Sequence, residues 1–109
     1  MNINEFCKAA HATAVEKGWY SQPTSFPEQL ANMHGELSEA LQEYAKGHGY
    51  KDTYYTKDGK PCGIPSELAD VVIRIMDTCA YLRIDLEGAI LEKMAYNMTR
   101  PYRHGGKVI

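Results

Sequence analysis

Apolar side chains recur at steps of three and four residues in four stretches of the chain, and this spacing predicts four amphipathic helices. The first is expected over residues 4–17, with Asn4 as its cap and Gly18 as its left-handed stop. Its apolar face is thin, because most of the side chains on it are small. The second is expected over residues 27–46, with Ser25 contributing to its cap.

The second and third predicted helices carry the strongest apolar stripes. The stripe of the second consists of Leu30, Met33, Leu37, Leu41 and Tyr44. The third is expected over residues 65–82, and its stripe consists of Leu68, Val71, Val72, Ile75, Met76, Cys79 and Leu82. The fourth is expected over residues 85–98, capped by Asp85, with an inner face of Leu86, Ile90, Leu91 and Met94. These helices and the length of the chain predict a single all-α domain over residues 1–109.

Two segments fall outside this helical pattern. Residues 47–63 are rich in glycine and form an irregular insert, in which the pair Asp58-Gly59 favours a small hairpin and Pro61 would weaken its second strand. An insert of this length in a small domain is usually functional or mobile. Residues 99–109 form a polar, basic tail, because Pro101 prevents the last helix from continuing.

Charge and composition narrow the class of protein. The net charge of −2 argues against binding to polymeric nucleic acid or to an anionic membrane surface. No apolar run approaches the roughly 20 residues that span a bilayer, and the first residues lack the features of a signal peptide. The three cysteines, Cys7, Cys62 and Cys79, are odd in number and widely spaced, so we expect reduced thiols in a cytoplasmic protein.

Two pairs of carboxylates are the strongest candidates for chemistry. Glu36 and Glu39 lie three residues apart on the second predicted helix, and Glu67 and Asp70 lie three apart on the third. Residues at this spacing share one helix face, so packing of the two helices would bring all four acids together. Their mutual repulsion would favour a divalent cation, and oxygen ligands suit Mg²⁺, with Mn²⁺ as a second possibility. The alternative is an ordinary solvated face, since acid pairs at this spacing are common on helices.

Basic residues gather near the end of the chain. Cations beside a carboxylate–metal centre favour a phosphate-bearing substrate, because they neutralise phosphate oxygens that the metal does not bridge. The candidate substrate-binding residues of this region are Lys93, Tyr96, Asn97, Arg100, Arg103, His104 and Lys107. A basic end that only complements the helix dipole is the alternative. Trp19 either stacks on a base or, as is more usual for an aromatic side chain, packs against the helices.

These residues lie in segments that resemble the MazG-like family of nucleoside triphosphate pyrophosphohydrolases, in particular its small single-domain members. The resemblance extends over residues 18–20, 34–41, 63–73 and 93–107 in the family's order and spacing. It implies an all-α, four-helix-type bundle that assembles as a dimer or a dimer of dimers. It also implies Mg²⁺-dependent hydrolysis of a nucleoside triphosphate between the α and β phosphates, giving a monophosphate and pyrophosphate.

The resemblance assigns metal binding and catalysis to Glu36, Glu39, Glu67 and Asp70, and nucleotide contacts to the basic tail. Many family members carry further acids one helical turn earlier, where this chain has Asn32 and Met33, so the number of metal ions and the catalytic base stay open. Two other interpretations also stay open. One is a phosphoribosyl-ATP pyrophosphohydrolase, and the other is a non-catalytic helical dimerisation module.

Overall fold

The structure, a computed structural model, describes all 109 residues and is mostly helical, as the sequence predicts. The helices are α1 (Ile3–Glu16), α2 (Phe26–Ala45), α3 (Ile64–Tyr81), α4 (Leu86–Met98) and the short α5 (Arg103–Gly106). The strands are β1 (Tyr54–Tyr55) and β2 (Pro61–Cys62). Every predicted helix begins and ends within two residues of its expected bounds. None of the helices combines the length and the apolar character needed to cross a bilayer.

Most of the predicted helix ends are confirmed. The side chains of Ser25 and Asp85 accept hydrogen bonds from the first turns of α2 and α4, and Gly18 follows α1 with positive φ. The predicted cap of α1 is wrong. Asn2 caps this helix, because Glu5, three residues later, accepts a hydrogen bond from the backbone N–H of Asn2 and completes a capping box.

Asn4 instead joins α1 to α4. Its side-chain amide donates to Asp85 Oδ1 at 2.8 Å and its oxygen accepts from the backbone N–H of Glu87. The backbone N–H of Ile3 also donates to Glu87 Oε1 at 2.9 Å. These bonds hold the N-terminal turn of α4 against the N-terminal turn of α1.

The insert forms the expected hairpin. The two short strands pair antiparallel, with Tyr54 opposite Cys62 and Tyr55 opposite Pro61, around a turn in which Gly59 has a φ of 89°. The ladder contains only two residues on each strand, which agrees with the expected effect of Pro61, a residue that cannot donate to it.

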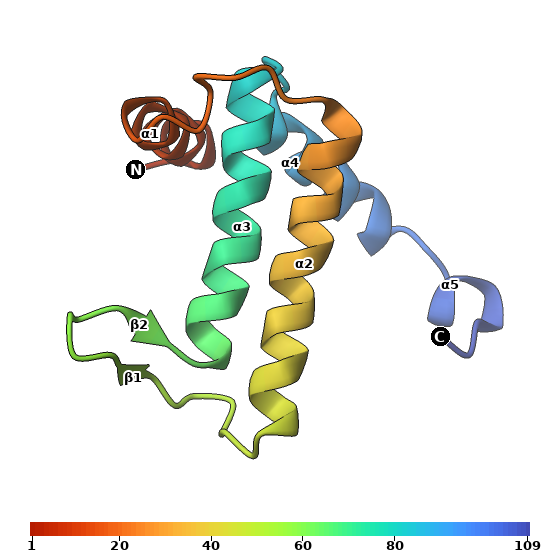
Figure 1. Ribbon diagram of the computed structural model, residues 1–109. Coiled ribbons are helices and arrows are strands. Elements are labelled where there is room, and N and C mark those ends of the chain that lie inside the picture. Colours follow the sequence, from red (N-terminus) through yellow and green to blue (C-terminus); the bar gives the residue numbers. More distant parts are fainter.

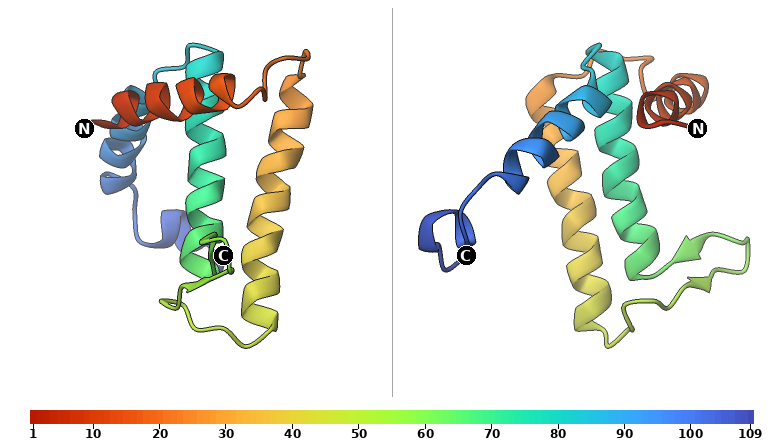
Figure 2. Two further views of the ribbon diagram at one scale, coloured as in Figure 1. Left: turned by 60° about the vertical axis from the view of Figure 1, so that its left-hand side comes forward. Right: turned by 180° about the vertical axis from the view of Figure 1, so that it is seen from behind.

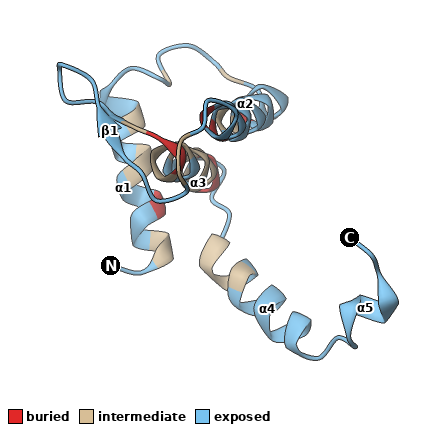
Figure 3. Ribbon diagram, turned by 90° about the horizontal axis from the view of Figure 1, so that it is seen from below, coloured by how far each residue is buried: buried red, intermediate tan, exposed pale blue.

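Helices α2 and α3 form a long antiparallel pair, and α1 crosses α3 near the end where α3 finishes (Figure 1). The views in Figure 2 show that α1 and the hairpin stand on the same side of the α2–α3 pair, whereas α4 leaves on another side. In Figure 3 the buried residues cluster around α3. The chain has few buried side chains, and none of the large ones is fully enclosed.

The apolar stripe of α2 does not face α3, and in this respect the sequence prediction is wrong. The residues of α2 that are buried or half-buried against α3 are Gln29, Met33, Glu36, Ala40 and Glu43. Leu37 and Leu41, one position later than Glu36 and Ala40, are 52% and 68% exposed. One residue turns a helix by about 100°, so a polar row forms the seam and most of the predicted stripe lies beside it.

Exposed apolar side chains gather on one side of the α2–α3 pair as a result of this arrangement. In two antiparallel helices, the positions that follow the seam positions lie on the same side of the pair. We call this side the apolar flank; its exposed members are Leu30, Leu37, Leu41, Tyr44, Leu68 and Val72. The predicted inner face of α4 is also open, since Leu91 and Met94 are each 61% exposed. Within one chain, α4 therefore lies outside the unit that α1, α2 and α3 form.

Candidate functional site

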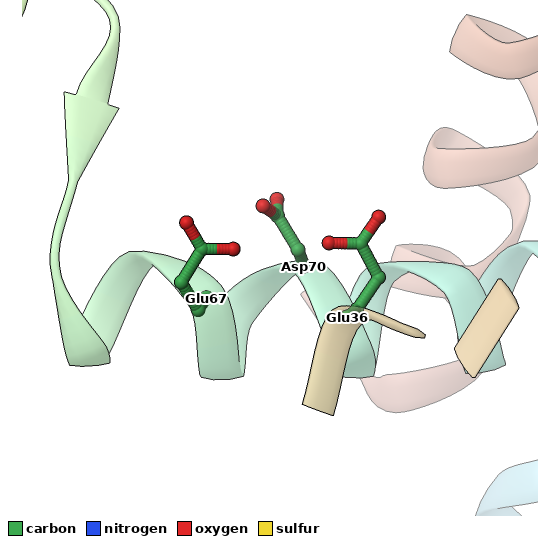
Figure 4. A group of neighbouring side chains, drawn as sticks. All are labelled: Glu36, Glu67 and Asp70. Atoms are coloured by element: carbon green, nitrogen blue, oxygen red, sulfur yellow. The ribbon is translucent and has the colours of Figure 1, made fainter. Parts of the chain in front are cut away.

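Three of the four predicted acids come together at the α2–α3 seam and open to the side away from the apolar flank. Glu36 from α2 and Glu67 and Asp70 from α3 each offer a carboxylate oxygen, and these oxygens lie within 4.8 Å of one another. Figure 4 shows the three side chains pointing to the same side of the helices. The hairpin and α1 border this side, which we call the acidic flank.

The start of α3 places Glu67 and Asp70. Gly63 precedes the helix with a φ of 117°, and a Cβ atom at this residue would collide with the backbone carbonyl of Asp52. Pro65 then sets the first helical turn, and Glu67 lies within that turn, where the positive end of the helix dipole favours an anion. A glycine at residue 63 is thus required for the insert to return tightly into the helix that carries the acids.

Burial and mutual repulsion shift the titration of these carboxyl groups. Burial, followed by a hydrogen bond with Glu39 and the charges of Glu39, Asp70 and Glu36, raises the pKa of Glu67 to about 7. Burial and the charge of Glu36 also raise the pKa of Asp70. Oε2 of Glu67 is enclosed and has no hydrogen-bond partner. A cluster of this kind is electrostatically unfavourable without a bound cation.

Glu39 takes a different position from the other three acids. It is exposed and does not belong to the group within 4.8 Å, although it lies close enough to Glu67 to contribute to the raised pKa of that carboxyl group. The predicted quartet is therefore a triad with one neighbouring carboxyl group that faces water.

Arg74, which the sequence patterns did not single out, is the cation of this cluster. Its Nε donates to Oε1 of Glu36 at 2.7 Å, and the side chain of Glu36 is only 15% exposed. Arg74 lies four residues after Asp70, one helical turn further along α3, so an acid–arginine spacing of four on one predicted helix was the available signal.

A second polar cluster, also missed from the sequence, attaches the hairpin to α2. The hydroxyl group of Tyr54 lies 2.8 and 2.9 Å from the two carboxylate oxygens of Glu43, which is buried in the α2–α3 seam. The ring of His48 stacks on that of Tyr54, with centroids 4.7 Å apart. Hydrogen bonding to Glu43 raises the pKa of Tyr54 to about 12, so this hydroxyl keeps its proton at neutral pH. The cluster fixes the hairpin at the border of the acidic flank.

A pocket of about 560 Å³ opens beside the acids, between α1 and the α2–α3 pair. Glu36, Asp70 and Arg74 line one part of it, and Trp19 lines another. Trp19 is 72% exposed, so the expectation that it packs against the helices is wrong. Small residues of α1 leave the space open; they are Ala9, Ala10, Thr13 and Ala14.

Polar groups fix the far wall of this pocket. Oδ1 of Asp77 lies 2.8 Å from Nδ1 of His11, and Oδ2 accepts from the hydroxyl of Tyr20 at 2.9 Å. The rings of Tyr20 and Tyr81 contact at 4.6 Å between centroids. Beside them Gln29 is 8% exposed, and its Oε1 is enclosed without a hydrogen-bond partner. This wall is polar and internally hydrogen-bonded, and beside it lies an amide oxygen that has no hydrogen-bond partner.

The predicted tail residues share a face but do not reach the acids of their own chain. The ammonium of Lys93 and the guanidinium of Arg100 lie 5.7 and 5.6 Å from the ring centre of Tyr96, and Asn97 is exposed beside them. The last three candidates, Arg103, His104 and Lys107, lie in or next to α5, a turn with positive φ at four consecutive residues. Figures 1 and 2 show α4 and α5 leading away from the acidic flank.

The residues of the triad fit a hard divalent cation. All of the offered atoms are carboxylate oxygens, which Mg²⁺ and Mn²⁺ prefer over nitrogen or sulfur. The enclosed, unpaired Oε2 of Glu67 is a further oxygen without a partner in the chain.

Comparisons with protein-family models, with curated proteins and with solved structures find no match to this chain.

Proposed function

We propose that the chain is a Mg²⁺-dependent hydrolase that cleaves nucleoside triphosphates between the α and β phosphates, releasing pyrophosphate. One observation carries this proposal: two acids of the carboxylate triad, Glu36 and Asp70, line a pocket that Trp19 also lines, and Glu67 adjoins them. The pocket is within the ~300–1,000 Å³ that small-molecule sites occupy, at about 560 Å³. The triad supplies the metal ligands and the pocket supplies space for a nucleoside.

Each group of the acidic flank has a role in this reaction. Glu36, Glu67 and Asp70 would hold the cation, which when bound polarises phosphate oxygens and lowers the pKa of a water molecule. Glu39 is exposed and stands next to Glu67, so we assign to its carboxylate the orientation of the attacking water and the acceptance of its proton. The Trp19 ring would stack on the base.

Measurement of pyrophosphate release tests the reaction. We expect release from one or more members of a panel of ribo- and deoxyribonucleoside triphosphates with phosphoribosyl-ATP included. We expect a loss of roughly 100-fold or more in Glu36→Gln and Asp70→Asn, because each removes a charge that holds the cation. Glu92→Gln, at an exposed position of α4, is the matched control and keeps the activity. Equal rates in folded acid variants would refute the site, and release of orthophosphate alone would refute the bond.

We further propose that a second copy of the chain covers the apolar flank, giving a dimer or a dimer of dimers. Leu37, Leu41 and Val72 are each more than half exposed there, and contiguous apolar surface of this kind marks an interaction site. The basic tail then has a place in the reaction: the tail of one copy contacts the nucleotide held by the acids of another, since it does not reach its own.

Mixed assemblies test this exchange of tails. An Asp70→Asn chain and an Arg100→Gln chain, each weakly active alone, should regain activity when they are unfolded together and refolded, because some mixed sites receive an intact triad and an intact tail. Absence of recovery in assemblies shown to be mixed would refute the role of the partner's tail.

A further inference from the structure

Arg74 belongs to both the acidic cluster and the pocket. Its Nε donates to Glu36, and its side chain is 40% exposed and lines the cavity. A guanidinium has five N–H donors, and the structure pairs only the one on Nε with an acceptor of the chain. The donors on its two terminal nitrogens are available to a ligand in the pocket.

The bond to Glu36 compensates a charge that would otherwise be costly. Glu36 is 15% exposed, and a carboxylate at this depth needs a cationic or hydrogen-bonding partner. A divalent cation bound by Glu36, Glu67 and Asp70 would supply the same compensation with twice the charge. It would also repel the guanidinium at this distance. Arg74 and the cation are therefore alternative partners of Glu36.

The geometry of the pocket indicates what a released guanidinium would meet. The cationic residues of the tail lie away from the acids of the chain, so Arg74 is the cation that both touches the cluster and lines the cavity. The planar fork of an arginine matches two oxygens of a phosphate group. A phosphorylated ligand with its organic part beside Trp19 would place a phosphate between the acids and Arg74.

We propose that Arg74 is an exchangeable cation of this site. It balances Glu36 while the triad is free of metal, and it binds the phosphate of the ligand once a divalent cation takes over Glu36. This inference rests on the proposed function for the cation and the phosphorylated ligand, but its test needs no turnover.

The first experiment measures the binding of Mn²⁺ alone. The electron paramagnetic resonance signal of the free ion is the readout. Arg74→Gln should bind Mn²⁺ about tenfold more tightly than the wild type, because the competing cation is gone. Arg74→Lys keeps the charge and should stay close to the wild type. Lys8→Gln, which removes a positive charge at an exposed position of α1 outside the pocket, should change nothing.

The second experiment measures the binding of adenosine monophosphate in the presence of Mg²⁺. The fluorescence of Trp19, the single tryptophan of the chain, is the readout. Arg74→Gln should weaken it about tenfold and Arg74→Lys by a smaller factor, since lysine lacks the fork. Binding of adenosine, which has no phosphate, should be unaffected. The same assays are repeated with cytidine and cytidine monophosphate. This second pair covers the case in which the pocket excludes adenine.

Opposite effects on metal and on monophosphate support the proposal, and a purely structural arginine would not produce them. If both affinities fall together, or if monophosphate binding is unchanged, the proposal is overturned. Should Arg74→Gln fail to fold, Arg74→Lys decides, because unchanged monophosphate binding in that variant overturns the fork contact. Wild-type protein that binds no Mn²⁺ overturns the inference and the metal site together, whereas Mn²⁺ binding without pyrophosphate release refutes only the proposed reaction.

Discussion

The two flanks of the α2–α3 pair are built from the same helices and yet expose opposite chemistry. The acidic flank holds Glu36, Glu67 and Asp70 beside a pocket that Glu36 and Asp70 line, with α1 and the hairpin bordering this flank. The apolar flank, one residue further around each helix, exposes leucines, a valine and a tyrosine. Neither flank is stable by its own contacts, because one concentrates negative charge and the other leaves apolar surface in water. The comparison indicates two separate requirements, a cation on one side and a protein surface on the other.

Charge placed on the apolar flank should give the largest effect, because it prevents contact with a second protein surface while the acids of the other flank are unchanged. Leu37→Glu combined with Leu41→Glu should reduce the particle mass from that of an assembly to that of a single chain, because burying two carboxylates in an apolar contact costs several kcal/mol. Light scattering after gel filtration measures the mass. Ala12→Glu, at an exposed position of α1 outside the pocket, is the control and should keep the assembly. A wild-type chain that is already monomeric at high concentration would contradict the proposed contact.

The acidic flank should make the metal-free protein less stable as the pH rises. The folded state raises the pKa of Glu67 from 4.5 to about 7, so it binds this proton more tightly than the unfolded chain does. The associated stability is fully present below pH 4.5 and is lost as the pH rises to about 7, with an upper limit near ~3 kcal/mol at 1.4 kcal/mol per pKa unit.

Thermal melting in EDTA across this range measures the loss, and Mg²⁺ should restore the stability at neutral pH by binding the folded state. Glu67→Gln is the control, because an amide does not titrate and the decline should become smaller. A melting temperature that rises with pH in EDTA would contradict the electrostatic account of the acidic flank.

The entry into α3 offers a smaller and more local perturbation of the same flank. Gly63→Ala should cost about 2 kcal/mol, since a side chain is strained at this φ and collides with the carbonyl of Asp52. Urea unfolding measures it. Gly35→Ala is a matched control within α2, where a Cβ meets nothing within 4 Å and alanine should stabilise the helix by up to about 1 kcal/mol. Equal effects of the two substitutions would contradict the requirement for glycine at residue 63.

The hairpin should respond to the smallest change. Tyr54→Phe removes the hydroxyl that bonds Glu43 and should cost about 1 kcal/mol, with faster amide hydrogen exchange in the hairpin. Tyr55→Phe, whose side chain is 67% exposed, should leave exchange unchanged. Unaltered exchange in Tyr54→Phe would show that other contacts hold the hairpin.

The sequence predicts the helices of this molecule better than it predicts their neighbours. Apolar spacing locates the helices, and the side chains of Ser25 and Asp85 mark two of their starts, because both effects are local. The stripe of α2 indicates only which face of the helix is apolar. It does not identify the surface that covers this face, so the pattern predicts Leu37 against α3, whereas Ala40 and Glu43 occupy the seam.

The candidate site is predictable to a similar extent. The spacing of Glu36, Glu67 and Asp70 is sufficient, because two helices in contact bring such acids together. The pocket depends on the crossing of α1 over α3, and the bond from Arg74 to Glu36 depends on how α2 packs against α3. No local pattern encodes either arrangement. Helix periodicity also does not predict the outward direction of α4, which carries the basic tail away from the acids.

The hydrogen bonds of Asn4 have a mechanical consequence. They join the first turn of α1 to the first turn of α4, across 81 positions of sequence between Asn4 and Asp85. Helix α1 is also a wall of the pocket, so the hydrogen bonds that fix the start of α4 also fix the start of the helix that forms this wall.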